Sequence, residues 1–373
     1  MDTVDLLYIT FVDLKGPANS GSSVRPQQML RAFREIGCSI KILDGWHNNR
    51  KERRSHVREI MQWLDTHHVR YCYVEPPAGP FFVREDLMLL KKLHKMSVPI
   101  GLFYRDIYWR FPEQFTEINP LKFFIIQCLQ KRDLSVFKKT VSLFYFPTDQ
   151  MAKIADFGMP YDVLPPGAEV MKESGQSEED DKRILQEDIL TLFFVGGLSP
   201  GYGFDVLLDA MKIINRDALK LRLLAVCREQ EWLDFQKRYS FVQPNWLEIH
   251  HVSFGNGLEE LYRKADLGVL PIRKSIYRDF AISVKLFEYI AHEKPILCTN
   301  VDAMSQIVQE NDLGWICKDT AEDMAKALED IIANRPMMME KKENIKQFLP
   351  ANTWKARARK VFSTLESVNK KNK

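Results

Sequence analysis

Short apolar runs alternate with amphipathic stretches along most of this 373-residue chain. A run of about four to eight apolar residues bounded by turn residues predicts a buried strand, whereas apolar residues at i, i+3, i+4 and i+7 predict a helix. Alternating strands and helices indicate a parallel sheet with helices on both faces, the doubly wound α/β arrangement. The predicted strands are residues 6–11, 39–43, 71–74, 100–104 and 143–146 in the first half, and 190–195, 219–226, 247–252, 267–270 and 295–298 in the second.

One polar stretch interrupts this alternation. Residues 169–188 are acidic and have little to bury, which is typical of a linker between domains. A chain of this length is too long for one core and suits two domains of about 150–200 residues. We therefore expect two Rossmann-like domains, at residues 1–168 and 189–350, and a final helix within residues 351–373 that can cross back to the first domain.

Composition and charge exclude several classes of protein. The apolar content of 45% favours folded domains, and residues 1–166 carry 23 basic and 18 acidic side chains. That net charge of +5 is too small to indicate nucleic-acid binding, but it suits anionic acceptors or a lipid surface. The six scattered cysteines form no C-x-x-C pair or metal-binding cluster, which favours a reducing cytosol. The acidic N-terminus predicts a first strand and not a signal peptide, and no apolar run approaches the ~20 residues of a membrane span.

The clearest candidate for chemistry is residues 277–291, between two predicted strands. Val284, Phe287 and Ala291 form the apolar stripe of a helix, and Lys285 and Glu288 lie three apart on a neighbouring face. A helix entered from a strand end directs free N–H groups toward the carboxyl edge of the sheet, where α/β proteins bind ligands. The ammonium and the carboxylate suit a ligand with phosphates and a ribose or sugar. The alternative is a surface ion pair on an ordinary crossover helix.

The carboxyl edge of the first predicted sheet carries further candidates. The loop after the first strand contains Gly16, Ser20 and Gly21, and small residues let a backbone approach a ligand closely. The alternative is a flexible turn, because the loop has neither a dinucleotide fingerprint nor the P-loop lysine.

Two carboxylates follow predicted strands of the same sheet. Glu75 and Asp106 each stand where a buried strand ends, and an unpaired carboxylate is costly inside a core. Tyr108 and Trp109 offer flat surfaces on which a sugar ring can stack. The alternative is a salt bridge between Arg105 and Asp106.

Two charged segments have simpler interpretations. Residues 50–58 predict a solvated helix face. Residues 121–144 mix aromatic and basic side chains, so they either contact an anionic membrane from the cytoplasmic side or pack on their own domain.

Several longer motifs carry a family resemblance. The segments FVGGLSPGYGFDVLLDAM, LEELYRKADLGVLPI, VKLFEYIAHEKPILCTN and LGWIC resemble the donor-binding half of GT-B-fold retaining glycosyltransferases of the family 4 (group 1) type. The small-residue loop, the helix that ends at Gly37 and VLPPG are similar to that family's acceptor half. The resemblance implies two domains facing across a cleft, a nucleotide-sugar donor in the second domain and an acceptor in the first. It also implies retention, no obligatory metal and no cofactor.

The resemblance assigns roles to particular residues. Glu288 matches the second glutamate of the family's paired-glutamate motif, whereas Phe280 stands at the first. The family's donor loop has an arginine and a lysine where this chain has Gly197 and Tyr202. Charge for a diphosphate must therefore come from other groups. The catalytic candidates are Asp106, Glu288, Lys285 and Glu75; the donor-binding candidates are Gly196, Gly197, Arg228, His251, Arg273, Lys274, Arg278, Lys285 and Glu288; the acceptor-binding candidates are Gly16, Ser20, Gly21, Tyr108 and Trp109.

The expected function is transfer of a sugar, of the hexosyltransferase type, from a nucleotide-sugar to a saccharide or lipid-linked saccharide. The resemblance places it in the cytoplasm, at the inner face of a bacterial membrane, in surface polysaccharide assembly. Two alternatives stay open: a non-catalytic GT-B-like partner subunit, favoured by the missing arginine and lysine, and a nucleotide-sugar epimerase of the same fold. An NAD dehydrogenase fits less well, because neither glycine-rich turn has the dinucleotide spacing.

Overall fold

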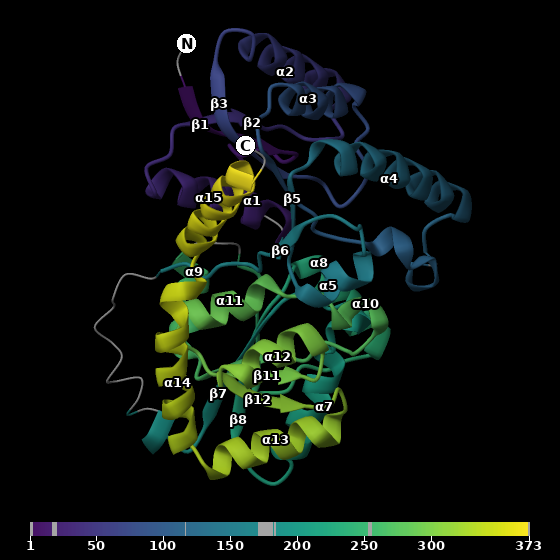
Figure 1. Ribbon diagram of the computed structural model, residues 1–373. Helices are drawn as coiled ribbons and strands as arrows, with labels where there is room; N and C mark the ends of the chain where they lie inside the picture. The colour runs from purple at the N-terminus through teal and green to yellow at the C-terminus, as the bar shows by residue number, and fades with distance from the viewer. Residues whose placement is uncertain are drawn as a thin grey trace. The chain divides into compact units, whose positions relative to one another are not determined.

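The chain folds into two compact units, residues 1–167 with 354–373 and residues 168–353 (Figure 1). The computed structural model describes residues 3–16, 21–115, 117–170, 182, 184–252 and 256–371. The predicted linker, residues 169–188, lies largely outside the described residues.

The first unit is built on a parallel sheet whose order, among the described residues, is β2-β1-β3-β4-β5-β6. Its central strands are buried on both faces, which explains why they appear in the sequence as continuous apolar runs. The strands are β1 (Thr3–Thr10), β2 (Ile40–Leu43), β3 (His68–Glu75), β4 (Ile100–Phe103), β5 (Leu143–Phe146) and β6 (Tyr161–Val163).

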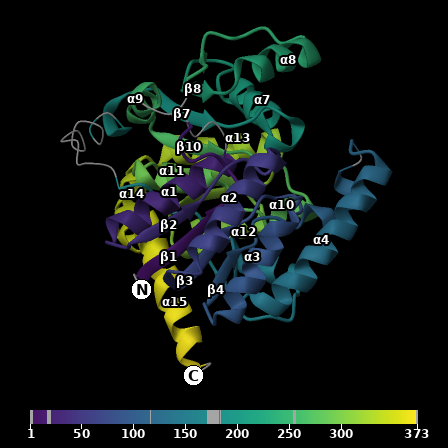
Figure 2. The same cartoon turned by 90° about the horizontal axis from the view of Figure 1, so that it is seen from above.

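Helices cover both faces of this sheet. The helices α1 (Gly21–Glu35) and α15 (Trp354–Lys371) contact each other and share a buried cluster with the strands that includes Tyr8, Phe33 and Val361. No described residue of α2 (Arg50–Trp63), α3 (Arg84–Lys95) or α4 (Pro120–Thr140) belongs to that cluster, and these three helices lie next to one another (Figure 2). The remaining helical segments are η1 (Tyr108–Arg110), η2 (Pro112–Gln114) and α5 (Asp149–Ala155).

The second unit repeats the architecture. Its parallel sheet has the order β12-β11-β10-β7-β8-β9 in the described part of the chain. The strands are β7 (Leu190–Val195), β8 (Leu221–Val226), β9 (Leu247–His250), β10 (Leu267–Leu270), β11 (Ile296–Thr299) and β12 (Gly314–Cys317). The helices are η3 (Pro200–Tyr202), α7 (Phe204–Ile214), α8 (Glu229–Tyr239), α9 (Asn256–Lys264), α10 (Ile276–Asp279), α11 (Val284–Ala291), α12 (Asp302–Glu310), α13 (Ala321–Ala333), α14 (Pro336–Phe348) and η4 (Leu349–Asn352).

Two buried clusters lie against the second sheet. One joins the strands to α7, α8 and α13, and the other joins them to α9, α11 and α12. Helices on both faces of parallel sheets, in two domains, confirm the predicted α/β fold class. The sequence did not predict β6, β12 or α14, and residues 277–291 contain two short helices, α10 and α11.

The prediction for residues 50–58 is wrong at one position. Arg53 is 1% exposed, and its guanidinium lies 2.8 Å from the carboxylate of Asp86 on α3 and stacks on Phe11. Arg53 shares the buried face of α2 with Val57 and Ile60, at i, i+4 and i+7, but the sequence does not show that its acidic partner lies on another helix.

Candidate functional site

The strand order locates a ligand crevice in the second unit. Chain order runs outward from β7 in one direction, through β8 to β9, and outward from β10 in the other, through β11 to β12. Open α/β sheets bind ligands outside the carboxyl ends of the two strands where the order reverses. The segments that follow these strands, residues 196–203 after β7 and 271–283 after β10, therefore form the expected crevice.

A glycine lets these two segments meet. Gly203 has a φ of 67°, and a Cβ there would lie 1.7 Å from the carbonyl oxygen of Pro271. The Arg273 N–H donates to the carbonyl of Gly201 at 3.1 Å, which fastens the segment after β10 to the glycine-rich turn. The turn therefore packs directly against residues 271–273, and any side chain at position 203 would prevent this contact.

Lys285 and Glu288 form one fixed group on α11. The helix begins after Ser283, whose hydroxyl accepts from the Lys285 N–H, and the Lys285 Nζ lies 2.7 Å from Glu288 Oε2. The same oxygen accepts from the Tyr262 hydroxyl at 2.8 Å. Burial and the neighbouring Glu288 raise the pKa of Tyr262 well above its ordinary value, so this phenol stays a donor. Glu288 is therefore held between a cation and a neutral phenol. The Lys285 side chain is 24% exposed and the Glu288 side chain 17%.

Among the other predicted cations, most are paired with acids. Arg273 lies 2.6 Å from Asp205, and Lys274 lies 2.5 Å from Asp302 and 3.5 Å from Asp279. The exposed Arg228 lies 3.2 Å from Glu231. These pairs leave less charge for a ligand than the sequence indicates.

Arg278 differs from the other predicted cations. Its guanidinium carbon lies 4.9 Å from the centre of the Tyr202 ring, and its Nη2 would be 2.3 Å from a Cβ at Gly201. The side chain is half-buried, and the described residues provide no acid within ion-pair distance of it. Arg278 therefore places an uncompensated charge over position 202, where the resembling family has its lysine.

Two backbone N–H groups of the turn after β7 already donate hydrogen bonds within the protein. The Gly196 N–H donates to the Val226 carbonyl at 3.1 Å, and the Leu198 N–H donates to the Glu231 carboxylate at 3.0 Å. His251 is exposed, and its Nδ1 lies 3.0 Å from the Cys227 carbonyl. Because the Gly196 N–H is bonded to β8, it is not available to a diphosphate. Binding of a diphosphate therefore depends more on side-chain charge than on the backbone groups of this turn.

The position of the family's first glutamate is apolar in structure as well as in sequence. Phe280 is 2% exposed and packs edge-on against Tyr277, with ring centres 5.4 Å apart. The adjacent Asp279 is half-buried, and desolvation raises the pKa of its carboxyl.

In the first unit the order of the strands reverses between β1 and β3, and Glu75 ends β3 at that point. Glu75 is 1% exposed; its Oε1 accepts from Arg25 Nε at 3.1 Å and from the Tyr73 hydroxyl at 3.0 Å. Arg105 lies 3.6 Å from the other oxygen, Oε2. Glu75 is thus a buried partner of two arginines.

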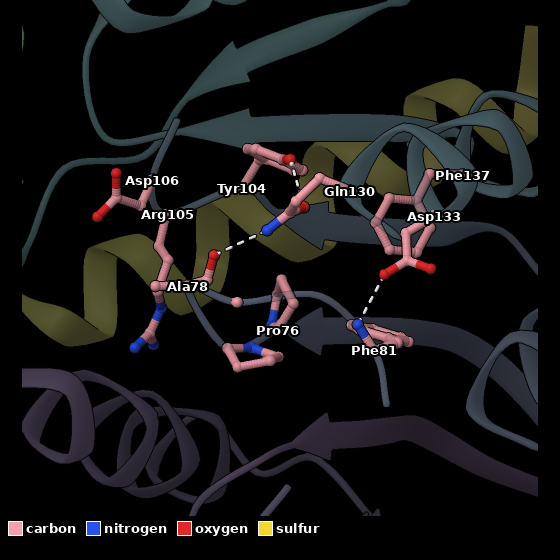
Figure 3. Close-up of a pocket in the computed structure, with 11 residues that line it drawn as sticks. Pro76, Ala78, Phe81, Tyr104, Arg105, Asp106, Gln130, Asp133 and Phe137 are labelled. Carbon is pink, nitrogen blue, oxygen red and sulfur yellow. Dashed lines mark hydrogen bonds between the residues drawn. The ribbon is translucent and has the colours of Figure 1, made fainter. Parts of the chain in front are cut away.

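Asp106 and its aromatic neighbours follow β4, the strand that pairs with β3 in the sheet. The half-buried Asp106 accepts from the Tyr108 N–H at 2.8 Å, whereas Trp109 is buried and donates to the Tyr104 hydroxyl at 3.1 Å. Figure 3 shows the Asp106 carboxylate and the Arg105 guanidinium pointing to opposite sides. Asp106 and Tyr108 are both half-buried, whereas the Trp109 ring is buried and cannot serve as an open stacking surface.

A small cavity adjoins the ends of β3 and β4. It measures about 10 Å³ and is lined by residues 76–79, Tyr104 and Gln130, which is room for about one water and not for a sugar. Gln130 closes it by accepting from Tyr104 at 3.1 Å and donating to the Ala78 carbonyl at 3.0 Å (Figure 3).

The small-residue loop is described only at its ends. Gly16 accepts from Gln27 Nε2 at 2.8 Å, Gly21 begins α1, and Ser20 lies outside the described residues. Sequence reasoning missed Arg25, Arg357 and Tyr262, because each comes from a helix whose facing strand is known only from the fold.

Within the described part of the chain, no helix has both the length and the hydropathy of a membrane span. The same residues contain no cluster of three or more His, Cys, Asp or Glu side chains suited to a metal.

Comparisons with known proteins bear on the second unit and on the fold. Residues 190–334 match the family model described as Glycosyl transferases group 1. No curated protein sequence matches the chain.

Three solved structures are similar over nearly the whole chain. Sucrose-phosphate synthase from Thermosynechococcus elongatus has 12% identity and a TM-score of 0.70, covering 98% of this chain and 99% of that one. WaaG, a glycosyltransferase involved in lipopolysaccharide biosynthesis, has 14% identity and a TM-score of 0.64, covering 96% and 99%. HepE from Anabaena, solved in complex with UDP, has 11% identity and a TM-score of 0.64, covering 97% and 100%. The second unit thus matches the glycosyl transferases group 1 family over residues 190–334, and nearly the whole chain has the two-domain α/β fold of GT-B glycosyltransferases.

Proposed function

We propose that this protein is a retaining, metal-independent glycosyltransferase of the family 4 type. The second unit holds a nucleotide-sugar donor, and the first unit holds the acceptor. Two observations in the segment after β10, within the region that matches the family model, carry the proposal: Arg278 lies over Tyr202, and Lys285 is paired with Glu288.

The donor site works mainly through charge. Arg278 and the Lys285 ammonium stabilise the diphosphate as the bond to the sugar breaks, because fixed cations in a desolvated site act where negative charge develops. Glu288 accepts hydrogen bonds from ribose or sugar hydroxyls, and Tyr262 and Lys285 hold its carboxylate in place. The acceptor hydroxyl attacks the sugar carbon from the face that the diphosphate leaves, which preserves the configuration. Asp106 is the first-unit carboxylate proposed to face the reacting carbon.

The acceptor is a saccharide or lipid-linked saccharide, in bacterial surface polysaccharide assembly. WaaG, with the same fold, belongs to lipopolysaccharide biosynthesis. In the cytoplasm the protein touches the inner face of the membrane through α4, which exposes Leu121, Phe124 and Ile125. A cavity of about 540 Å³ between α3 and α4 is lined by Lys91, His94, Lys95, Arg132 and Lys139, a charge that suits anionic headgroups.

A panel of nucleotide sugars tests the donor assignment. Thermal stability is measured with each compound, because a ligand that binds the native state raises the melting temperature. Turnover of the best donor is then compared between wild type and Glu288→Gln, which keeps shape and loses charge. The matched control is Glu260→Gln, since Glu260 lies in an exposed ion pair with Lys264. We expect Glu288→Gln to lower turnover by ~100-fold or more, equivalent to ~2.7 kcal/mol. Turnover equal to that of the control would refute the role of Glu288.

A non-catalytic partner subunit is the second candidate. It is favoured by Phe280 and Tyr202, which occupy positions of charged residues in the resembling family. Calorimetry with UDP and GDP separates the two functions, because a partner subunit of this kind binds neither.

A further inference from the structure

His292 ends helix α11 and joins it to α9, which lies beside it (Figures 1 and 2). Its ring stacks on that of Tyr262, with the ring centres 3.7 Å apart and an angle of 6° between the planes. Its Nε2 lies 3.0 Å from the carboxylate of Glu259, three residues before Tyr262 on α9. Its Nδ1 lies 2.7 Å from the backbone carbonyl oxygen of Glu288. His292 therefore contacts both the helix and the aromatic ring that hold the proposed donor carboxylate.

The two hydrogen bonds of His292 depend on its protonation. A backbone carbonyl and a carboxylate only accept hydrogen bonds, so each ring nitrogen has to donate. Both bonds form together only when the ring carries two protons, which makes it an imidazolium. The surroundings suit a cation, because the ring lies at the C-terminal end of a helix and beside an acid.

This ring covers the face of the tyrosine whose hydroxyl holds Glu288. Tyr262 is 1% exposed, and the rings of Phe193 and Tyr289 pack edge-on against it, with centres 4.7 and 6.1 Å away. With His292 on its face, the phenol ring is restrained to one position. A cation over an aromatic ring is attracted by its electrons, and drawing on those electrons makes the hydroxyl a stronger donor. That hydroxyl donates to Glu288 Oε2 at 2.8 Å.

The hydrogen bond from Tyr262 decides which oxygen of Glu288 a ligand meets. Oε2 accepts from Tyr262 and also from Lys285, at 2.7 Å. Within the described part of the chain, Oε1 accepts only from Lys285, at 3.0 Å. Since a carboxylate oxygen has room for two hydrogen bonds, Oε2 is filled and Oε1 keeps one place for a hydroxyl. Rotation of the carboxylate would break the bond to Tyr262.

We propose that His292 is a positioning residue of the donor site, which acts through Tyr262 to present Glu288 Oε1 to the ribose hydroxyls of the nucleotide. This role rests on the donor function proposed above for the second unit, and it assigns Glu288 to the ribose and not to the transferred sugar. His292 needs no contact with the ligand to act in this way. Its loss should therefore weaken the ribose contact and spare the contacts to the diphosphate.

Discrimination between ribose and dideoxyribose tests this role. Titration calorimetry of the full chain with UDP, GDP and ADP identifies the nucleotide that wild type binds best. The same measurement with its 2′,3′-dideoxy form gives the ratio of the two Kd values. We expect a ratio of ~10 or more in wild type, the effect of one hydrogen bond to a charged group. Because both compounds carry the same diphosphate, the ratio reports the ribose contact alone.

Three variants should lower this ratio. We expect Tyr262→Phe and His292→Gln each to lower it by ~2- to 10-fold, as for loss of an ordinary hydrogen bond. Glu259→Gln removes only the carboxylate that pairs with His292, at a side chain 42% exposed, so it should lower the ratio less and keep the fold. It gives the measurement if His292→Gln does not fold. The matched control is Glu260→Gln, the next residue on α9, whose exposed pair with Lys264 should leave the ratio unchanged.

A double variant separates positioning from a general effect on packing. If His292 acts through Tyr262, His292→Gln should change the ratio little when Tyr262→Phe is already present, because residues that act as a unit are not additive. Additive losses would overturn the proposal, as would a wild-type ratio in Tyr262→Phe, or in both His292→Gln and Glu259→Gln. A ratio near one in wild type would also overturn it and leave nucleotide binding intact. Failure of wild type to bind any of the three nucleotides would instead reject the donor function itself.

Discussion

Removing the guanidinium of Arg278 tests how a donor turn without the family's arginine and lysine holds a diphosphate. In Arg278→Ala the turn after β7 loses the cation that lies 4.9 Å from the Tyr202 ring. The fold should tolerate the change, because a half-exposed cation–π contact contributes only ~0.5–1 kcal/mol. The effect should therefore appear in ligand affinity more than in stability.

The magnitude follows from charge and distance. A unit charge about 4 Å from a phosphate is worth roughly 4 kcal/mol at an effective dielectric of ~20, an upper value for a half-exposed side chain. Hydrogen bonds to charged groups contribute about 1.5–3 kcal/mol in practice. We therefore expect the Kd for a nucleoside diphosphate to rise by ~10- to 150-fold.

Titration calorimetry with UDP, GDP and ADP measures this Kd. The control is Arg238→Ala, which removes the same charge from an exposed position near the end of α8. Because α8 starts at the carboxyl edge of the sheet, its last turn lies toward the opposite edge. Arg278→Lys should recover part of the lost affinity, since it restores charge without the planar fork. Equal affinities for Arg278→Ala and the control would refute our account of the diphosphate site.

Three further measurements follow from the structure. Gly203→Ala should lower the free energy of unfolding in urea by more than ~2 kcal/mol, because a Cβ there meets the Pro271 carbonyl. The control Gly158→Ala, at a φ of 62° with open space around it, should lower this free energy by only ~1–2 kcal/mol. Equal losses in the two variants would contradict the packing argument. Desolvation raises the pKa of Asp133 to about 6, above the ~3.9 of an unfolded chain, so this carboxyl lowers the free energy of unfolding as pH rises through that interval. Asp133→Asn should therefore flatten the pH dependence of the urea midpoint between pH ~4 and ~6. An unchanged slope would argue against the raised pKa of Asp133. Phe124→Glu should abolish sedimentation with vesicles of anionic phospholipid while Leu233→Glu on α8 leaves it intact, and retention of binding by Phe124→Glu would reject α4 as the membrane-facing helix.

The sequence was most informative where one side-chain pattern determines one element. The strands Leu143–Phe146, Leu190–Val195 and Leu267–Leu270 have the predicted bounds, because a continuous apolar run between turn residues has no other stable environment. The four-residue strand Gly314–Cys317 was not predicted, since only one of its residues is buried.

The site was harder to predict because it depends on pairings between distant elements. Lys285 and Glu288 lie three apart on one helix, so their contact follows from local spacing. Tyr262 lies 26 residues from Glu288, and Arg25 lies 50 residues from Glu75. Those contacts exist only once the strand order is known, and no local pattern contains that order.

The last helix of the chain, α15, has a consequence for biosynthesis. Trp354, Ala358, Val361 and Leu365 are core residues of a unit whose strands all precede residue 168 in the chain. Gly101 of β4 leaves the space that Tyr145 and Leu365 fill, since a Cβ there would lie 2.7 Å from the tyrosine and 3.2 Å from the leucine. On the ribosome, residues 168–353 therefore form a continuous unit that can complete its core first, while the first sheet keeps part of one face uncovered until α15 has been synthesised. A chain ending at residue 353 should keep a protease-resistant second unit and lose the first, and equal resistance of both would show that the early strands close without their final helix.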